Sequence, residues 1–481
     1  MILVAATGDR FMSEQIFNAK HVAISADIVH HFSALAAGLR YEDLPEAARE
    51  AAKKSILDTF GVMLAASGME PAVLGVIEVV KESAGTPQAS ILGFGGRVPA
   101  TMAALANGAL AHCLDYDDQT PWGQHAASSI IPAVFALAER KGGVTGKDMI
   151  AAVAAGQDIF ARLRCNVGWK KDWNLSTVMG VFAATAAAGR VMGFNAKQTA
   201  NALGIASMQC SGIMEMVCGT GSDLRGLYAG FSAKGAVLAA LMAEKGVPGI
   251  DCLFEGGYGF FNTYFDGRYD RDKILEDIGV DYKGSVTLYK RWPSVGTAHS
   301  HMKAIIDIVS DNDLAPDDIA EIRLFVGDYH ALMCEPLDVR KAPATLADAK
   351  FSLPFLVAVA AVRRGMSVLD FTESGLRDTK VLATANKISL VADASLDWKL
   401  ELPLGRVEVV AADGRRWERS GTHIPGNADN PMTWADLCSK FAECAAVAVS
   451  PLSSHRIAEV QRLVQLLEDV EDVAELMRTL Q

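Results

Sequence analysis

Apolar residues recur at the spacing of helical turns through nearly every segment between Ala26 and about Phe265. The background is rich in Ala, Leu, Met and Val, and glycines separate the segments. Because apolar positions three and four residues apart form one face of a helix, this pattern predicts a large helical domain. The expected helices are Ala47 to Leu64, Pro99 to Leu114, Ser129 to Arg140, Lys147 to Val167, Val178 to Met192, Ala196 to Gln209 and Ala229 to Lys245.

The pattern changes after Tyr269, where β-rich runs alternate with helical ones. Asp413-Gly414 separates two such runs and is typical of a hairpin turn that needs positive φ. The alternation predicts an α+β unit. Its expected strands are Ser285 to Tyr289, Ile319 to Val326 and Gly405 to Ala411, and its expected helices are Ala298 to Ser310 and Phe355 to Val362.

The chain returns to helical spacing at Thr433 and ends in a helix expected over Ile457 to Met477. We expect these terminal helices to pack back on the first domain, which would make that domain discontinuous. The predicted fold class is therefore mainly α, with an all-helical domain of residues 26–270 and 427–481 and a smaller α+β domain of residues 271–426. Residues 1–25 are predicted to be a disordered extension.

Composition narrows the function classes. At 481 residues and 50% hydrophobic content the chain can bury two cores, and its net charge of −12 disfavours nucleic acid and anionic membrane surfaces. Charged residues interrupt the apolar stretches, so no membrane span is predicted, and Met1 to Ala6 is too short for a signal core. The eight cysteines form no C-x-x-C pair, which indicates reduced thiols in a cytoplasmic protein.

The first candidate site is the segment Ala111 to Thr120 together with His125. Asp115, Asp117 and Asp118 crowd three carboxylates into four residues, which predicts a raised pKa for at least one of them. A carboxyl with a raised pKa near a histidine could form an acid/base pair. The alternative is that Asp117 and Asp118 cap the next segment and that His125 is an ordinary loop histidine.

The second candidate site is the glycine-rich turn Gly219 to Gly221, which leads through Arg225 into a long helix. Such a turn can present backbone N–H groups and a cation to an anion at a helix N-terminus. It lacks the Gly-Lys-Ser/Thr ending of a nucleotide loop, and no strand precedes it. The alternative is a flexible connection between two helices.

The third candidate site is the cationic turn Tyr289 to Pro293. On a rim loop, Lys290 could reach into an interdomain cleft and hold a carboxylate as a point charge. The alternative is an ordinary solvent-facing lysine. His299 and His301 follow at the start of a helix, but they lack the i, i+4 spacing of a helical metal pair, so no metal site is predicted.

Taken together, these segments resemble the MmgE/PrpD family, which includes 2-methylcitrate dehydratase, cis-aconitate decarboxylase and iminodisuccinate epimerase. The resemblance spans nearly the whole chain from about Ala26. Its landmarks are Tyr41 to Pro45, Leu57 to Gly61, Asn107 to His112, Asp115 to Asp118, Ile130 to Ala133, Phe351 to Pro354 and Asn430-Pro431. The resemblance implies a homodimeric enzyme with a helical domain, an α+β lid domain, an active site between them, and no metal or organic cofactor.

By position, the resemblance implies catalytic roles for Asp115, His125 and Lys290. Four further positions are expected to bind substrate and carry residues that differ from the better-studied members. Gln119 replaces a threonine, and Arg225 replaces a lysine. Histidines are replaced at three positions, by Asn174, Tyr228 and Val295.

These replacements bear on the substrate. Asn174, Tyr228 and Val295 remove imidazoles that could titrate near neutrality, which makes a pocket for methylcitrate or cis-aconitate doubtful. Arg225 keeps a positive charge and offers two N–H groups to a carboxylate. We therefore expect an anion with fewer or differently placed carboxylates than the citrate analogues.

The resulting prediction is a lyase of the dehydratase type that removes a proton next to a carboxylate and expels a β leaving group. Lys290 and Arg225 would hold the carboxylate, and Asp115 and His125 would transfer protons. One alternative is an epimerase, which needs two bases flanking one carbon, for instance Tyr228 or Asp115 opposite His125. A third possibility is a non-catalytic relative that only binds its ligand.

Overall fold

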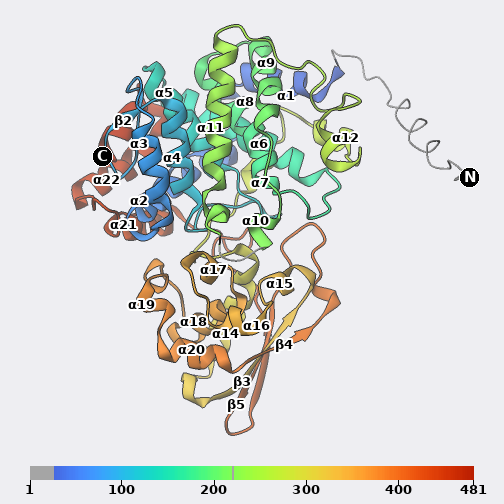
Figure 1. Cartoon of the computed structure of the whole chain (residues 1–481), viewed down its shortest axis with the longest axis vertical. Coiled ribbons are helices and arrows are strands. Elements are labelled where there is room, and N and C mark those ends of the chain that lie inside the picture. Colours follow the sequence, from blue (N-terminus) through green and yellow to red (C-terminus); the bar gives the residue numbers. More distant parts are fainter. Residues whose placement is uncertain (1–25, 219–221) are drawn as a thin grey trace, which may run out of the picture.

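The computed structural model describes residues 26–218 and 222–481, which form a large helical unit and a smaller unit of helices and strands (Figure 1). The predicted fold class, mainly α with a smaller α+β part, is confirmed. The extension predicted over residues 1–25 and the glycine turn Gly219 to Gly221 lie outside the described residues.

All seven helices expected in the large unit are present, with shifted ends. α2 continues to Met69, beyond the expected Leu64, and α11 begins at Leu224. A short antiparallel pair, β1 (Ala89–Ser90) and β2 (Arg97–Val98), precedes α4. The helices of this unit are α1 (Ile28–Gly38), α2 (Glu46–Met69), α3 (Ala72–Glu82), α4 (Ala100–His112), α5 (Ala127–Lys141), α6 (Gly146–Cys165), α7 (Leu175–Val178), α8 (Gly180–Met192), α9 (Ala196–Ala206), α10 (Glu215–Cys218), α11 (Leu224–Glu244), α12 (Phe260–Phe265) and α13 (Arg271–Leu275).

Helices α4 and α11 approach each other backbone to backbone. A side-chain carbon added at Gly108 would lie 2.6 Å from Cα of Gly230, a distance that such atoms do not tolerate. One added at Gly226 would lie 3.1 Å from Cα of Cys113. The glycines therefore let the C-terminal end of α4 lie beside the first turns of α11, which brings His112 close to the start of α11.

The smaller unit contains a sheet with strand order β4-β3-β5-β6. The strands predicted from Ile319 and from Gly405 are present as β3 (Ile319–Val326) and β5 (Arg406–Ala411). β5 pairs antiparallel with β6 (Arg416–Ser420), and Gly414 between them has φ +87°, which confirms the predicted hairpin. β4 (Ile388–Ala392), which pairs parallel with β3, was not predicted.

Helices α14 (His299–Asp311) and α18 (Leu353–Arg363) correspond to the two helices expected in this unit. Their buried apolar residues belong to a core that also contains inward-facing residues of β3 and β5. Further short helices complete the unit: α15 (Asp328–Leu332), α16 (Leu337–Lys341), α17 (Leu346–Lys350), α19 (Glu373–Leu376) and α20 (Thr379–Asn386).

The strand predicted over Ser285 to Tyr289 is wrong. Lys283–Val286 forms a short 3-10 helix. Leu288 pairs outside any sheet, in a single bridge in which it exchanges backbone hydrogen bonds of 2.8 and 2.9 Å with Gln119. Within the segment only Leu288 and Tyr289 are buried, and the hydroxyl of Tyr289 donates to the backbone oxygen of Ala51 in α2 at 2.9 Å. The bridge ties this segment to the loop that carries the aspartates.

The C-terminal helices α21 (Trp434–Ala446), α22 (Ser454–Gln465) and α23 (Ala474–Thr479) lie on the large unit, where Figure 1 shows them in red near α2. Their apolar residues belong to the same core as those of α1 to α11. The single helix expected over Ile457 to Met477 is wrong, because α22 ends at Gln465 and α23 begins only at Ala474.

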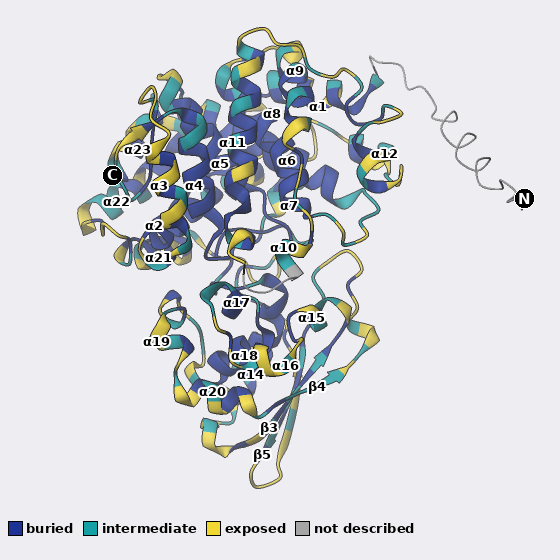
Figure 2. Cartoon of the chain, in the orientation of Figure 1, coloured by how far each residue is buried: buried dark blue, intermediate teal, exposed yellow. Residues whose placement is uncertain are grey.

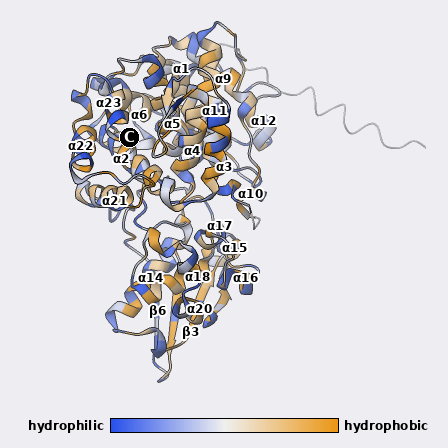
Figure 3. Cartoon of the chain, turned by 60° about the vertical axis from the view of Figure 1, so that its left-hand side comes forward, coloured by the Kyte–Doolittle hydropathy of each residue, from blue (hydrophilic) through white to orange (hydrophobic). Residues whose placement is uncertain are grey.

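Burial and hydropathy follow this division. Figure 2 shows α4, α5 and α8 largely buried inside the large unit, and Figure 3 shows β3 as predominantly hydrophobic.

Two segments, Leu175–Met192 and Leu224–Glu244, have the length and composition of membrane spans, contrary to the sequence analysis. In this fold 89% and 67% of their apolar windows are buried inside the protein.

Candidate active site

A cavity lies between the two units, and residues from both line it. The large unit contributes the end of α4, the loop that follows it, the segment before α7 and the first turns of α11. The smaller unit contributes residues 295–297 and several aromatic side chains. Six of the seven predicted site residues line the cavity: Asp115, Gln119, His125, Asn174, Arg225 and Tyr228.

The loop after α4 turns sharply at Asp115. This residue has φ +48°, in the left-handed region, and its N–H donates to the backbone oxygen of His112 at 2.7 Å. Aspartate tolerates this conformation better than most residues. Asp115, Asp117 and Asp118 are all buried, so the cluster is not a solvated loop.

Asp115 forms a buried ion pair with Lys290. The Lys290 ammonium group binds the carboxylate and also donates to the backbone oxygen of Asp115 at 2.9 Å. Burial by itself raises the pKa of Asp115, but the ammonium group and the nearby imidazoles outweigh burial and lower it below its ordinary value. Asp115 is therefore an ionised, paired carboxylate and a weak base.

This pairing corrects the position predicted for Lys290. The residue does not sit on a rim loop, because only 1% of it is exposed and it is not among the residues that line the cavity. The backbone bridge at Leu288 holds the lysine next to the aspartate loop. In this arrangement Lys290 compensates the charge of Asp115, and its ammonium group binds the carboxylate and the backbone oxygen of that residue.

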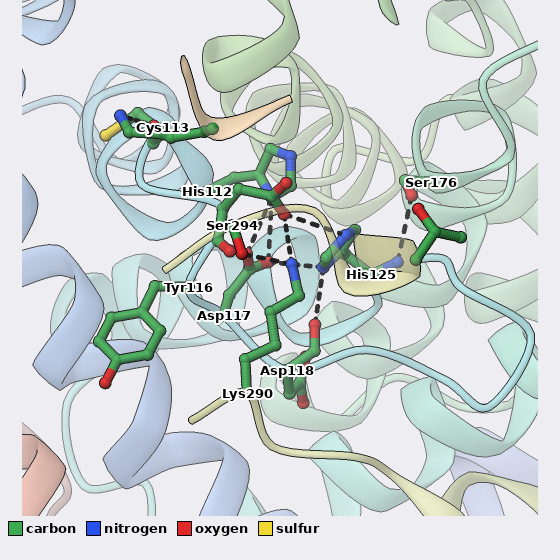
Figure 4. A network of polar contacts seen from close by, with 12 residues as sticks. His112, Cys113, Tyr116, Asp117, Asp118, His125, Ser176, Lys290 and Ser294 are labelled. Atoms are coloured by element: carbon green, nitrogen blue, oxygen red, sulfur yellow. Dashed lines mark hydrogen bonds and ion pairs between the residues drawn. The ribbon is translucent and has the colours of Figure 1, made fainter. Parts of the chain in front are cut away.

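Asp117 lies between two imidazoles (Figure 4). Its carboxylate oxygens are 3.0 and 3.1 Å from Nδ1 of His112, and Oδ2 is 3.2 Å from Nδ1 of His125. Burial alone raises the pKa of Asp117, but the two histidines lower it well below its ordinary value. His112 lines the cavity; it lay inside the first candidate segment, but no role was predicted for it.

The contacts of His125 fix its tautomer. Nδ1 lies 2.7 Å from the backbone oxygen of Asp118. A carbonyl oxygen only accepts, so Nδ1 carries the hydrogen and Nε2 is the ring nitrogen that can take up a proton. Nε2 lies 3.6 Å from Oδ1 of Asp115, which would stabilise an imidazolium. The backbone N–H of His125 donates to Oγ of Ser176 at 3.1 Å.

Asp118 is the carboxyl with a raised pKa, about 8. Burial is the main cause, and repulsion by Asp58 and Asp117 contributes less, so the crowding invoked from the sequence is a secondary effect. Oγ of Ser55 donates to Oδ2 of Asp118 at 2.6 Å. The amide of Ala127 at the start of α5 opposes the rise in pKa, but no side chain of the described residues caps α5 by a hydrogen bond, so the capping alternative is not supported for this helix.

Arg225 is a buried cation at the start of α11. It is 4% exposed, and its guanidinium carbon lies 3.7 Å from the centre of the Phe351 ring. Among the described residues, Nε and Nη1 have no hydrogen-bond partner. Burial, together with the positive charge of Arg340, lowers the pKa of Arg225 to about 10. Arg225 is therefore a charged hydrogen-bond donor that can bind an anion in the cavity.

The remaining predicted residues are neutral. Oδ1 of Asn174 caps α7 by accepting from the N–H of Thr177 at 3.2 Å. The ring of Tyr228 lies 4.3 Å from that of His112, and burial raises the pKa of its hydroxyl well above 10. The side chain of Gln119 packs against Gly296, where any Cβ would collide with it.

Four of these groups are close enough to hold a metal ion. His112, Asp115, Asp117 and His125 could each supply one ligand atom, and these atoms lie within 4.8 Å of one another. Imidazole and carboxylate groups suit Zn²⁺, a possibility that spacing along the chain did not indicate. In this structure the groups bind one another and Lys290 instead, and the absence of a metal stays a prediction.

Lys440, on α21, supports the site without lining the cavity. Its Nζ donates to the backbone oxygens of Tyr116 at 2.7 Å and Lys290 at 2.9 Å, and it pairs with Oδ1 of Asp58 at 2.7 Å. Through its two backbone acceptors this buried lysine joins the aspartate loop to the Lys290 segment.

Two family models match the chain. The MmgE/PrpD N-terminal domain matches residues 30–272, and the MmgE/PrpD C-terminal domain matches residues 292–466. The second match runs into α21 and α22, whose apolar residues belong to the core of the large unit.

Similar proteins cover nearly the full chain. A cis-aconitate decarboxylase-like protein of Aspergillus oryzae is 25% identical over 91% of this chain and 94% of its own length. A cis-aconitate decarboxylase of Aspergillus terreus is 24% identical over 96% of both chains. The cis-aconitate decarboxylase of Homo sapiens is 24% identical over 92% of both chains.

Proposed function

This chain belongs to the MmgE/PrpD family, as its sequence motifs indicated, and we propose that it is a lyase that removes a proton next to the carboxylate of a small organic acid. One observation carries the proposal: the same cavity is lined by Arg225, whose buried Nε and Nη1 have no partner in the described part of the chain, and by His125, whose Nε2 can take up a proton. The first binds a carboxylate, and the second removes a proton from the adjacent carbon.

The proposed reaction is an elimination of water. Arg225 binds the carboxylate, and Nε2 of His125 takes the α proton, so that the C–H bonding pair becomes enolate-like charge on the carboxylate. That pair then forms the carbon–carbon double bond while the β hydroxyl leaves with the proton returned by the imidazolium. Asp115 stabilises the imidazolium from 3.6 Å away. Its lowered pKa makes it a weak base, so the proton transfers belong to His125.

Decarboxylation is the second candidate, because the similar proteins are named for it. There the carbon–carbon bond to the leaving carboxylate would break, its electron pair would stay on the substrate carbon, and the protonated His125 would deliver a proton to that carbon. Both reactions use the same imidazole and a stabilised carbanion.

The epimerase alternative has less support from the geometry. An epimerase needs two bases on opposite sides of one carbon. Asp115 lies only 3.6 Å from Nε2 of His125, which leaves no room for a carbon between them, and the raised pKa of Tyr228 keeps its hydroxyl protonated. The non-catalytic alternative would account for the donors of Arg225 that have no partner among the described residues, but it gives no role to Nε2 of His125 in the same cavity.

The proposal also includes a homodimer, a cytoplasmic location and a reaction that needs no metal or organic cofactor. Its test incubates the enzyme in EDTA with hydroxy and unsaturated carboxylic acids and follows each acid by proton NMR. We expect one acid to lose or gain water, His125→Gln to lose this activity, and His455→Gln, at an exposed position on α22, to keep it. Equal turnover by His125→Gln would contradict the proposal, and loss of activity only in EDTA would indicate a metal.

A further inference from the structure

The charged groups next to the cavity compensate one another, with one exception. Asp115 is paired with Lys290. Asp117 is shared by His112 and His125, so protonation of one imidazole would balance its charge. With one lysine for two carboxylates, this cluster has no Lys or Arg side chain in excess that could hold a substrate anion.

The exception is Arg225. It is the only Lys or Arg side chain among the described residues that line the cavity, and its Nε and Nη1 have no partner there. The neighbouring arginines are engaged elsewhere. Arg164 donates to Gln124 and to the backbone oxygen of Trp122, and Arg340 donates to backbone oxygens that include those of Leu332 and Phe351.

The rest of the lining is uncharged and includes several aromatic side chains. The rings of Trp169 and Trp398 lie 6.0 Å apart, and that of Tyr329 lies 4.4 Å from that of Trp398. The polar side chains that complete the lining include the uncharged amides of Gln119 and Asn174. These groups suit an uncharged part of a ligand that bears a hydroxyl or another neutral polar group.

We infer that the substrate of this site is a monocarboxylate, whose single carboxylate binds Arg225 and whose uncharged remainder lies against the aromatic side chains. This inference rests on the proposed function. A second or third carboxylate would be buried with no opposite charge, which weakens binding by about a hundredfold or more. The site then differs from one that takes cis-aconitate, a tricarboxylate.

The inference also separates the two candidate reactions. The only carboxylate of a monocarboxylate is the group that binds Arg225 and takes up the charge when the α proton leaves. It must stay on the substrate through the reaction, so the leaving group is not carbon dioxide. A monocarboxylate therefore favours elimination of water over decarboxylation.

The test measures binding by calorimetry to the full-length His125→Gln variant, which removes the proposed base and so prevents turnover. The ligands are three matched sets of small acids: 3-hydroxybutanoate and crotonate, malate and fumarate, and citrate and cis-aconitate. We expect a monocarboxylate to bind at least a hundredfold more tightly than the tricarboxylates. Adding Arg225→Gln should remove this binding, Arg225→Lys should keep part of it, and Arg415→Gln, an exposed control on the β5–β6 turn, should leave it unchanged.

Three results would overturn the inference: tighter binding of citrate or cis-aconitate, monocarboxylate binding that survives Arg225→Gln in a folded variant, or no binding by any acid of the panel. A second measurement, turnover by the unmodified enzyme, distinguishes failure of this inference from failure of the proposed function. A monocarboxylate that binds through Arg225 but exchanges no α proton would contradict the proposed function, and only the preference of the site for binding monocarboxylates would remain. Turnover of a tricarboxylate would do the reverse.

Discussion

Replacing Lys440 with methionine tests whether the buried lysine holds the site segments together. The substitution keeps the apolar stem and removes the ammonium group, which binds the backbone oxygens of Tyr116 and Lys290 and the carboxylate of Asp58. All of these acceptors are buried or face the interior, so water cannot replace the lost N–H groups without opening the structure.

The expected loss is about 3–5 kcal/mol of unfolding free energy, the range for removing one partner of a buried ion pair. Burial already raises the pKa of Asp58, and Lys440 opposes that rise. Without the lysine the pKa of Asp58 rises further, so the folded variant binds a proton that the unfolded chain releases. The loss relative to the unmodified protein should therefore grow as the pH rises and shrink as it falls.

Urea unfolding followed by tryptophan fluorescence at pH 5 and pH 8 measures this loss. Lys303→Met is the matched control, because its half-exposed ion pair with Asp307 is worth less than about 1 kcal/mol. Adding Asp58→Asn to Lys440→Met should recover part of the stability, because it removes the buried carboxylate that has lost its lysine partner. A Lys440→Met variant within about 1 kcal/mol of the unmodified protein at both pH values would refute the reasoning.

Three further predictions concern the site and the helix pair behind it. His125→Gln should lower kcat by about 10²–10⁴ with an unchanged melting temperature, and a smaller effect would remove this residue from the proton transfer. Because the pKa of Asp118 is raised to about 8, the protein should lose stability as the pH rises from about 4 to about 8. Asp118→Asn should flatten this dependence in melting curves, and an equal slope in both proteins would contradict the assignment. Gly108→Ala should lower the unfolding free energy by about 1–3 kcal/mol, because its Cβ would lie 2.6 Å from Cα of Gly230, whereas the exposed Gly75→Ala should not destabilise the protein.

The helices were predictable because their apolar periodicity is continuous, and the hairpin because Asp413-Gly414 is a local turn signal. The Ser285 to Tyr289 segment misled because its residues have strand composition, but the segment lies beside α2 and α6 and begins in a 3-10 helix. Such an outcome depends on which surface the segment meets, and periodicity within one segment carries no such information.

The sequence predicted which residues form the site better than it predicted how they are arranged. Asp115, His125 and Arg225 were identified from motifs and from the family resemblance. The burial of Lys290 follows from the backbone bridge between Leu288 and Gln119, which joins distant parts of the chain. Lys440 had no local signal at all, since its acceptors lie in segments far from it in sequence.

Deuterium incorporation tests the central claim, that His125 removes the α proton of a small carboxylic acid, most directly. The enzyme is given the unsaturated product acid in deuterated buffer, and the hydrated acid is analysed by proton NMR. The account predicts one deuterium on the α carbon, on one face only, and none with His125→Gln. A hydrated acid without deuterium at that carbon, or incorporation that persists in His125→Gln, would contradict it.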